Sequence, residues 1–138
     1  MFISYGNFTY VCKKVRFGGG TTPVVTKPPT GYCPKHFVEF QDYCYFLGPN
    51  ALDWQSAVTA CQGYGTKYIL ASVHSMKENA FIASLLYADK NQETNQVWLG
   101  GSNLHTRSYG FDYRWTDYTD FNVDNWAKNE PNDVGYTL

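Results

Sequence analysis

The sequence predicts one small domain that combines strands with two helices and ends in a long loop region. Aromatic residues cluster around 37–46, apolar residues recur at helical spacing within 53–87, and residues 102–138 are rich in Asn, Asp, Gly, Ser and Thr. The chain of 138 residues can bury a substantial core. Its aromatic content of 18% is too high for a disordered segment. A globular fold follows.

The first thirty-one residues divide into a strand and a spacer. Residues 8–11 alternate weakly, which predicts a short strand ending at Cys12-Lys13-Lys14. Residues 16–31 hold three consecutive glycines and three prolines, which is typical of a linker. The threonines and prolines of this linker also suit O-glycosylation, although an unmodified linker explains them equally well.

The middle of the chain contains the regular elements. Aromatic and apolar residues within 37–46 flank Cys33 and Cys44, which predicts a hairpin of two strands joined by a disulfide. A first helix is expected over 53–62, because Asp53 suits an N-cap and the apolar residues that follow share one face. Ser75 and Glu78 form a capping box that opens a second helix ending near residue 87.

Regular structure fades after a predicted buried strand at 97–99 and its glycine turn. Residues 102–138 have the composition of long loops that carry function. Trp98, Trp115 and Trp126 are interpreted as anchors of the core and the loops, with stacking on sugar rings as the alternative. Carboxylates at 117, 120 and 124 are interpreted as turn caps, with calcium ligation as the alternative.

Charge and motifs exclude several classes of function. The net charge of −1 gives no electrostatic indication of binding to nucleic acid or to an acidic membrane surface. No run of about 18 apolar residues could span a bilayer. His36, His74 and His105 lack zinc-site spacing, and no GxSxG or HExxH motif occurs. Glu130 and Asp133 lie too close together in a turn for a hydrolase pair, so no enzyme is predicted.

The four cysteines favour disulfides over metal binding, because no CxxC pair occurs among them. A Cys33–Cys44 bond would close a small loop and indicates an oxidising compartment, hence a secreted or extracellular protein. The sequon at Asn7 agrees with secretion. The amino terminus lacks the features of a signal peptide. We therefore expect a fragment of a longer polypeptide or an incomplete gene product.

Glu130-Pro131-Asn132 places a carboxylate and an amide on either side of one proline. Both side chains offer oxygen ligands, and Ca²⁺ takes six to eight of them at roughly 2.3–2.6 Å. A cis bond at Pro131 could aim both side chains the same way. On this tripeptide alone, a surface turn is the simpler interpretation.

The order of several short motifs changes that interpretation. Together they resemble the C-type lectin domain over about residues 32–138. The resemblance is carried by Cys33 with Cys44, Asp53-Trp54 through Ala57 to Cys61, residues 70–75, 78–82, 97–100 and 115–117, and Asn125-Trp126 leading to Glu130-Pro131-Asn132.

The resemblance implies an α+β fold of two helices, small antiparallel sheets and a long irregular loop that binds calcium and sugar. In such domains, Ca²⁺ binds adjacent hydroxyls of mannose-type sugars. Glu130 and Asn132 match the residues that contact both the ion and the sugar, and Asp133 matches an auxiliary calcium ligand. The expected partner is a mannose-type glycan or glycoprotein. The alternative is a lectin-fold module that binds protein without sugar.

The resemblance is incomplete at the end of the sequence. The family's further calcium ligands and last cysteine would follow Leu138, so we expect this polypeptide alone to bind calcium and sugar feebly or not at all. In the family, the cysteine at the Cys61 position pairs with that last cysteine. Residues 8–14 resemble the family's terminal strand, so residues 1–15 are interpreted as the remnant of a preceding lectin domain in a tandem array. If this segment folds back, Cys12 could pair with Cys61.

Overall fold

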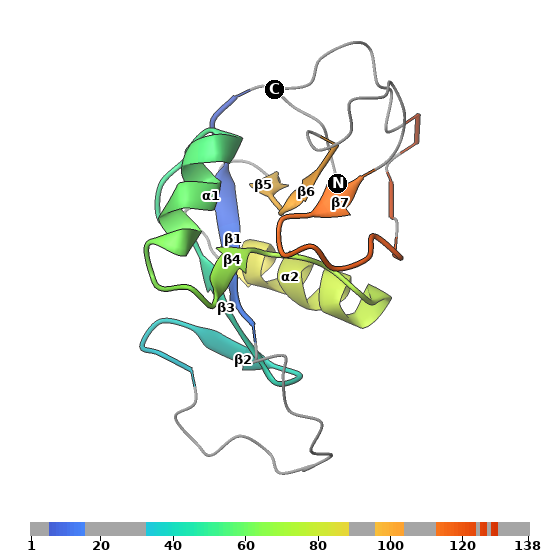
Figure 1. The fold of residues 1–138 in the computed structure, drawn as a ribbon. Coiled ribbons are helices and arrows are strands. Elements are labelled where there is room, and N and C mark those ends of the chain that lie inside the picture. The colour runs from blue at the N-terminus through green and yellow to red at the C-terminus, as the bar shows by residue number, and fades with distance from the viewer. Residues whose placement is uncertain are drawn as a thin grey trace.

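The computed structural model describes residues 6–15, 33–88, 96–103, 113–123, 125–126 and 128–129 (Figure 1). Two helices and seven short strands occur within these ranges. In chain order they are β1 (Thr9–Lys14), β2 (Val38–Phe40), β3 (Tyr43–Leu47), α1 (Trp54–Gln62), β4 (Tyr68–Leu70), α2 (Met76–Ala88), β5 (Val97–Trp98), β6 (Gly101–Ser102) and β7 (Arg114–Trp115). The α+β class predicted from sequence is confirmed.

The N-terminal strand β1 lies in the middle of the main sheet, between β3 and β4 (Figure 1). The sheet order is β2-β3-β1-β4, and β5 also pairs with β1. Cys12 is opposite Phe46 on one side and Leu70 on the other, both in antiparallel register. The β1–β5 pair is parallel, a feature that the sequence analysis did not predict. The fold-back of residues 8–14 is therefore observed.

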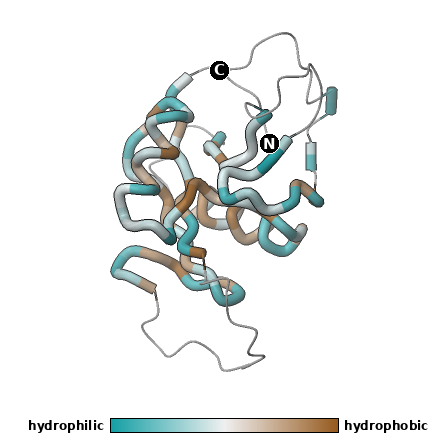
Figure 2. The backbone as a smooth tube through the Cα atoms, viewed as in Figure 1, coloured by the Kyte–Doolittle hydropathy of each residue, from teal (hydrophilic) through white to brown (hydrophobic). Residues whose placement is uncertain are grey.

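Strand β1 separates two hydrophobic clusters. Because side chains alternate along a strand, Tyr10 and Cys12 face one cluster, which includes Val58 of α1. Val11 faces the other cluster, which includes Ile82 of α2. Hydrophobic stretches lie on the helices and the strands between them, whereas many connecting turns are hydrophilic (Figure 2). Both faces of β1 are therefore buried, as expected of a central strand.

Two disulfides hold this arrangement. Cys12 is bonded to Cys61 of α1 with a Cα–Cα distance of 5.3 Å, the pairing that the sequence analysis offered as a hypothesis. Cys33 is bonded to Cys44 of β3 with a distance of 5.4 Å, as expected. The first bond ties β1 to α1. The second ties the entry of the segment 33–88 to the β2–β3 hairpin.

Both predicted helices are present, with the expected caps. Asp53 accepts a hydrogen bond of 2.9 Å from the backbone amide of Ser56 at the start of α1. At the start of α2, the hydroxyl of Ser75 accepts from the amide of Glu78 at 3.0 Å. The carboxylate of Glu78 reaches back one residue further than in the usual capping box and accepts from the amide of His74.

The hairpin between β2 and β3 turns through Gln41 and Asp42, whose φ angles are 47° and 70°. Two consecutive positive φ values are typical of a type I′ turn, which matches the twist of the flanking strands. Glycine and asparagine are the usual residues there, so the sequence signal for this turn is weak.

A second sheet of two strands, β6 and β7, was not predicted. Gly101 is opposite Trp115 in this pair, and each strand has only two residues. Gly100 precedes it and makes a close approach, because a Cβ there would lie 2.4 Å from the carbonyl oxygen of Leu70. Elements this short carry too little periodicity to be recognised in sequence.

Candidate functional site

The tripeptide proposed to bind calcium and sugar lies outside the described residues, as does Asp133. The roles of Glu130 and Asn132 and the cis bond at Pro131 therefore remain predictions. The nearest described residue is Asn129, which is exposed and has a φ of 69°. Its left-handed backbone agrees with a turn at the entrance to the tripeptide.

Aromatic side chains anchor the chain that leads to this turn. Trp115 is fully buried and stacks on Phe121 with ring centroids 4.6 Å apart. Trp126 stacks on the same Phe121 at 5.8 Å and contacts Tyr113 at 4.9 Å. Trp98 packs edge-on against Phe8, and its indole nitrogen donates to the carbonyl of Leu52. These contacts support the interpretation of the three tryptophans as anchors.

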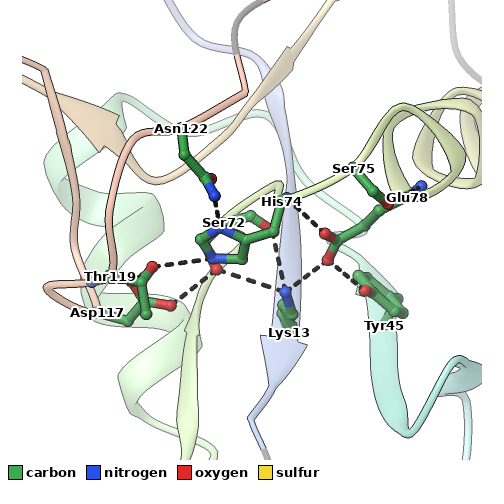
Figure 3. Close-up of polar contacts among 9 residues, drawn as sticks. All are labelled: Lys13, Tyr45, Ser72, His74, Ser75, Glu78, Asp117, Thr119 and Asn122. Carbon is green, nitrogen blue, oxygen red and sulfur yellow. Dashed lines mark hydrogen bonds and ion pairs between the residues drawn. The ribbon is translucent and has the colours of Figure 1, made fainter.

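Lys13, Tyr45, Ser72 and Glu78 form a buried polar cluster, which contacts the loop 117–122 through Ser72 (Figure 3). The ammonium of Lys13 is 2.5 Å from Oε1 of Glu78, and the hydroxyl of Tyr45 donates to the same oxygen at 2.5 Å. The amine also donates to the carbonyl oxygen of Ser72 at 3.2 Å. Lys13 is 1% exposed and Glu78 is 4% exposed, so water can contribute little to the solvation of either charge.

Glu78 stays ionised in this cluster because its hydrogen bonds outweigh its burial. Burial alone raises the pKa of this carboxyl, but bonds from Lys13, Tyr45 and the amide of His74 hold the pKa below the ordinary value of 4.5. The pKa of Tyr45 is raised by burial and by the neighbouring Glu78 carboxylate. A lysine cation therefore faces a glutamate anion, with a protonated tyrosine beside them.

The cluster continues to the loop that follows β7. Its connecting residue is Ser72, whose hydroxyl lies 3.4 Å from the Lys13 amine and donates to Oδ2 of Asp117 at 2.8 Å. Thr119 donates its hydroxyl to Oδ1 of Asp117 at 2.5 Å. The ring of His74 lies between Thr119 and Asn122 (Figure 3). A continuous chain of polar contacts thus joins β1 to the loop.

Asp117 acts as the expected turn cap, since it accepts from the backbone amide of Thr119 at 3.0 Å. The structure adds that it is only partly exposed and is bonded to Ser72. Burial raises the pKa of Asp117, but the bonds from Thr119 and Ser72 outweigh it and hold the pKa below 3.8. Asp120 is exposed, and Asp124 lies outside the described residues.

The described ranges contain no group of three or more His, Cys, Asp or Glu side chains that could hold a metal ion. Neither helix of the described part is long and apolar enough to cross a membrane.

The asparagine of the predicted glycosylation site is exposed to solvent. Asn7 is exposed, whereas Thr9 of the same sequon is buried in β1 and donates its hydroxyl to the carbonyl of Gly48 at 2.6 Å. Glycosylation of Asn7 remains a prediction. Among the histidines, His36 is exposed, His105 lies outside the described residues, and His74 belongs to the polar cluster.

Sequence reasoning missed the buried polar cluster. Lys13 stands near the expected end of a strand, where a lysine is usually solvated. One signal was available: Lys13 shares a strand face with Val11, two residues earlier, and Val11 lies in the core. The partner Glu78 was predicted only as a helix cap, and nothing in its spacing indicates a lysine 65 residues away.

Comparison with known proteins identifies the family. The sequence model of the Lectin C-type domain matches residues 50–136. The galactose-specific lectin nattectin of Thalassophryne nattereri is 32% identical over 107 residues, which cover 78% of this chain and 64% of the relative. A type-2 ice-structuring protein of Osmerus mordax is 32% identical over 99 residues, covering 72% and 51%. The low affinity immunoglobulin epsilon Fc receptor of Mus musculus is 30% identical over 103 residues, covering 75% and 28%.

This chain thus spans less than two thirds of the length of each of these relatives. No solved structure matches the chain. The family model covers more than half of the sequence, and the family is not one of enzymes, as predicted. The family match agrees with the α+β fold and with the two disulfides of the structure. The chain belongs to the C-type lectin domain family.

Proposed function

We propose that this chain is a calcium-dependent carbohydrate-binding module for mannose-type glycans. The observation that carries the proposal is the tripeptide Glu130-Pro131-Asn132, which follows an aromatic-anchored loop in a chain of the C-type lectin family. Glu130 and Asn132 would each contact the ion and a sugar hydroxyl. The galactose specificity in the name of one relative belongs to that protein and leaves the sugar preference of this chain to experiment.

The chemistry of the donor set suits calcium. Ca²⁺ is a hard cation that prefers carboxylate and carbonyl oxygens, and a sugar diol can replace water in its shell. Glu130, Asn132 and Asp133 supply such oxygens, but the ion takes about six to eight ligands. We therefore propose weak binding by this polypeptide, with a dissociation constant on the order of 1 mM, the weak end of the extracellular range.

The two disulfides support a secreted or extracellular protein, because such bonds persist in oxidising compartments. We further propose that residues 1–15 derive from the end of a preceding lectin domain and that residues 16–31 are the linker between the two. The position of β1 between β3 and β4 supports this proposal, because a segment that resembles a terminal strand of the family pairs within the main sheet.

A lectin-fold interaction module without sugar binding is the second candidate. Its support is the names of the relatives, which include a receptor for immunoglobulin and an ice-structuring protein. Family membership alone therefore does not fix the ligand.

The test is an NMR titration of the ¹⁵N-labelled polypeptide with CaCl₂ up to about 20 mM, a range chosen for millimolar affinity. The proposal expects the amide signals around residues 129–133 to shift with calcium, and Glu130→Gln to abolish the shift. Glu39→Gln is the matched control, because Glu39 is an exposed carboxylate on β2. Shifts that survive Glu130→Gln would refute the site, and micromolar affinity would refute the expected shortage of ligands.

A further inference from the structure

We propose that His74 is a pH-dependent latch that holds the loop 117–122 against the turn before α2. His74 lies between β4 and α2, and its ring reaches two residues of the loop. Nε2 is 2.9 Å from the hydroxyl oxygen of Thr119, and Nδ1 is 3.3 Å from Oδ1 of Asn122 (Figure 3). The ring therefore bridges two points of one loop.

The hydrogen-bond partners of the His74 ring indicate which protonation state of the ring fits these contacts. The hydroxyl of Thr119 has one proton, and it is donated to Asp117 at 2.5 Å. The Thr119 oxygen must then accept from His74, so Nε2 must carry hydrogen. Oδ1 of Asn122 is also an acceptor, so Nδ1 must carry hydrogen as well. An imidazolium satisfies both contacts, whereas a neutral ring satisfies only one.

The neutral ring can regain a second partner within the protein only if Asn122 or Thr119 rearranges, because both contacts of the ring are with these two residues. Asn122 could reverse its amide and present its NH₂ group to the bare nitrogen, because the two ends of an amide have nearly the same shape. Otherwise Thr119 must withdraw its proton from Asp117. The first change gives up the contact through Oδ1 of Asn122, and the second gives up the bond from Thr119 to Asp117. Loss of the ring proton therefore weakens the hold on residues 117–122.

Other charged groups surround the ring. Glu78 of α2 accepts from the His74 amide, and Lys13 of β1 is connected through Ser72. Asp117 contacts the ring's partner Thr119, while Asp120 on the loop and Lys77 on α2 are exposed. The pKa values of Glu78 and Asp117 lie below their ordinary values, so both stay ionised above pH 5. Imidazole is the side chain that ordinarily changes charge between pH 5 and 8.

The latch has a direction. At acidic pH the imidazolium donates from both nitrogens and holds the loop 117–122. At mildly alkaline pH the neutral ring holds the loop less tightly. The loop leads along the chain toward residues 128–129, which precede the proposed calcium ligands. The latch itself does not depend on the proposed sugar binding, because all of its groups lie in the described part of the chain.

The experiment is hydrogen exchange of the segment 117–122 at pH 5 and pH 8, with rates corrected for the intrinsic pH dependence of exchange. The reporter is the amide of Thr119, which donates to Asp117. We expect its protection factor to be about fivefold lower at pH 8, the effect of losing one hydrogen bond. In His74→Gln the factor should be the same at both pH values. His36→Gln is the control, because His36 is exposed and outside the cluster, and it should keep the fall.

A second variant decides the matter even if His74→Gln misfolds. Asn122 is exposed, so Asn122→Asp should fold, and its carboxylate cannot turn to present a donor. Its negative charge also favours the imidazolium, so the fall in protection should occur at a higher pH than in the unchanged chain when the pH range is extended upward. Equal protection at both pH values in the unchanged chain, a fall that persists in His74→Gln, or a fall at an unchanged pH in Asn122→Asp would each overturn the latch.

Discussion

The ammonium of Lys13 lies 2.5 Å from a carboxylate oxygen of Glu78, although 65 residues separate them in the chain. This contact joins the central strand β1 to the first turn of α2. It also gives Glu78 three roles, because the same carboxylate accepts from Tyr45 and from the amide of His74. Insertion of the N-terminal strand is thus coupled to the polar cluster that supports the loop.

Replacing Lys13 should destabilise the fold strongly. Lys13→Met removes the cation and leaves the Glu78 carboxylate buried without its partner, which typically costs about 3–5 kcal/mol. Urea unfolding followed by fluorescence would measure this loss. Lys14→Met is the matched control, because Lys14 is the next residue of β1 but is only partly buried, and it should cost less than about 1 kcal/mol.

Neutralising the partner should then recover stability. The double variant Lys13→Met/Glu78→Gln leaves no unpaired buried charge. We therefore expect it to recover at least about half of the unfolding free energy that Lys13→Met loses, as for other buried pairs. Equal stability of Lys13→Met and Lys14→Met would show that the ion pair does not form.

The two disulfides should contribute unequally to stability. The Cys12–Cys61 bond closes 49 residues and the Cys33–Cys44 bond closes 11, so on the chain-entropy account their removal costs about 4 and about 3 kcal/mol. Paired Cys→Ala variants, compared by thermal unfolding, test the order. A smaller loss for the Cys12 and Cys61 pair would contradict the proposed structural role of β1.

Acid should unfold the protein partly through Glu78 and Asp117. Both carboxyls have pKa values below their ordinary 4.5 and 3.8 in the folded chain, so the unfolded chain binds more protons as the pH falls. Their contribution is complete above those ordinary values and is lost as the pH drops through the folded pKa values. The urea midpoint should therefore fall most steeply below pH 4.5.

Asp117→Asn isolates one part of this effect. An amide at position 117 cannot titrate, so the variant should lose less stability than the unchanged chain between pH 5 and pH 3. Identical slopes in the two proteins would show that the Asp117 carboxylate contributes nothing to acid sensitivity.

Local signals in the sequence were sufficient to predict the helices. Asp53 and Ser75 are strong caps that stand immediately before apolar residues of helical spacing, and both helices begin at the next residue. The hairpin was also predictable, although its turn uses Gln41 and Asp42 in place of the usual glycine and asparagine. The short β6–β7 pair was not, because two-residue strands have no measurable period.

Long-range relationships were harder to predict. The Cys12–Cys61 bond followed only from a resemblance to the family, since spacing alone does not fix connectivity. The contacts of Lys13 and of His74 depend on how distant segments meet, and no local pattern encodes them. The proposed ligands Glu130 and Asn132 show the converse case. Their motif is visible in sequence, whereas their placement lies outside the described residues.

Calcium-dependent recognition of mannose-type sugars is tested most directly by saturation-transfer NMR, which detects weak ligands. Methyl α-mannoside and methyl β-galactoside would each be tested against the unchanged chain and against Glu130→Gln. The spectra would be recorded in about 10 mM CaCl₂, a concentration chosen for millimolar calcium affinity, and again after addition of EDTA. We predict transfer to the mannoside in calcium only, and its loss in Glu130→Gln. Transfer that persists after EDTA, or that favours the galactoside, would contradict the proposed function.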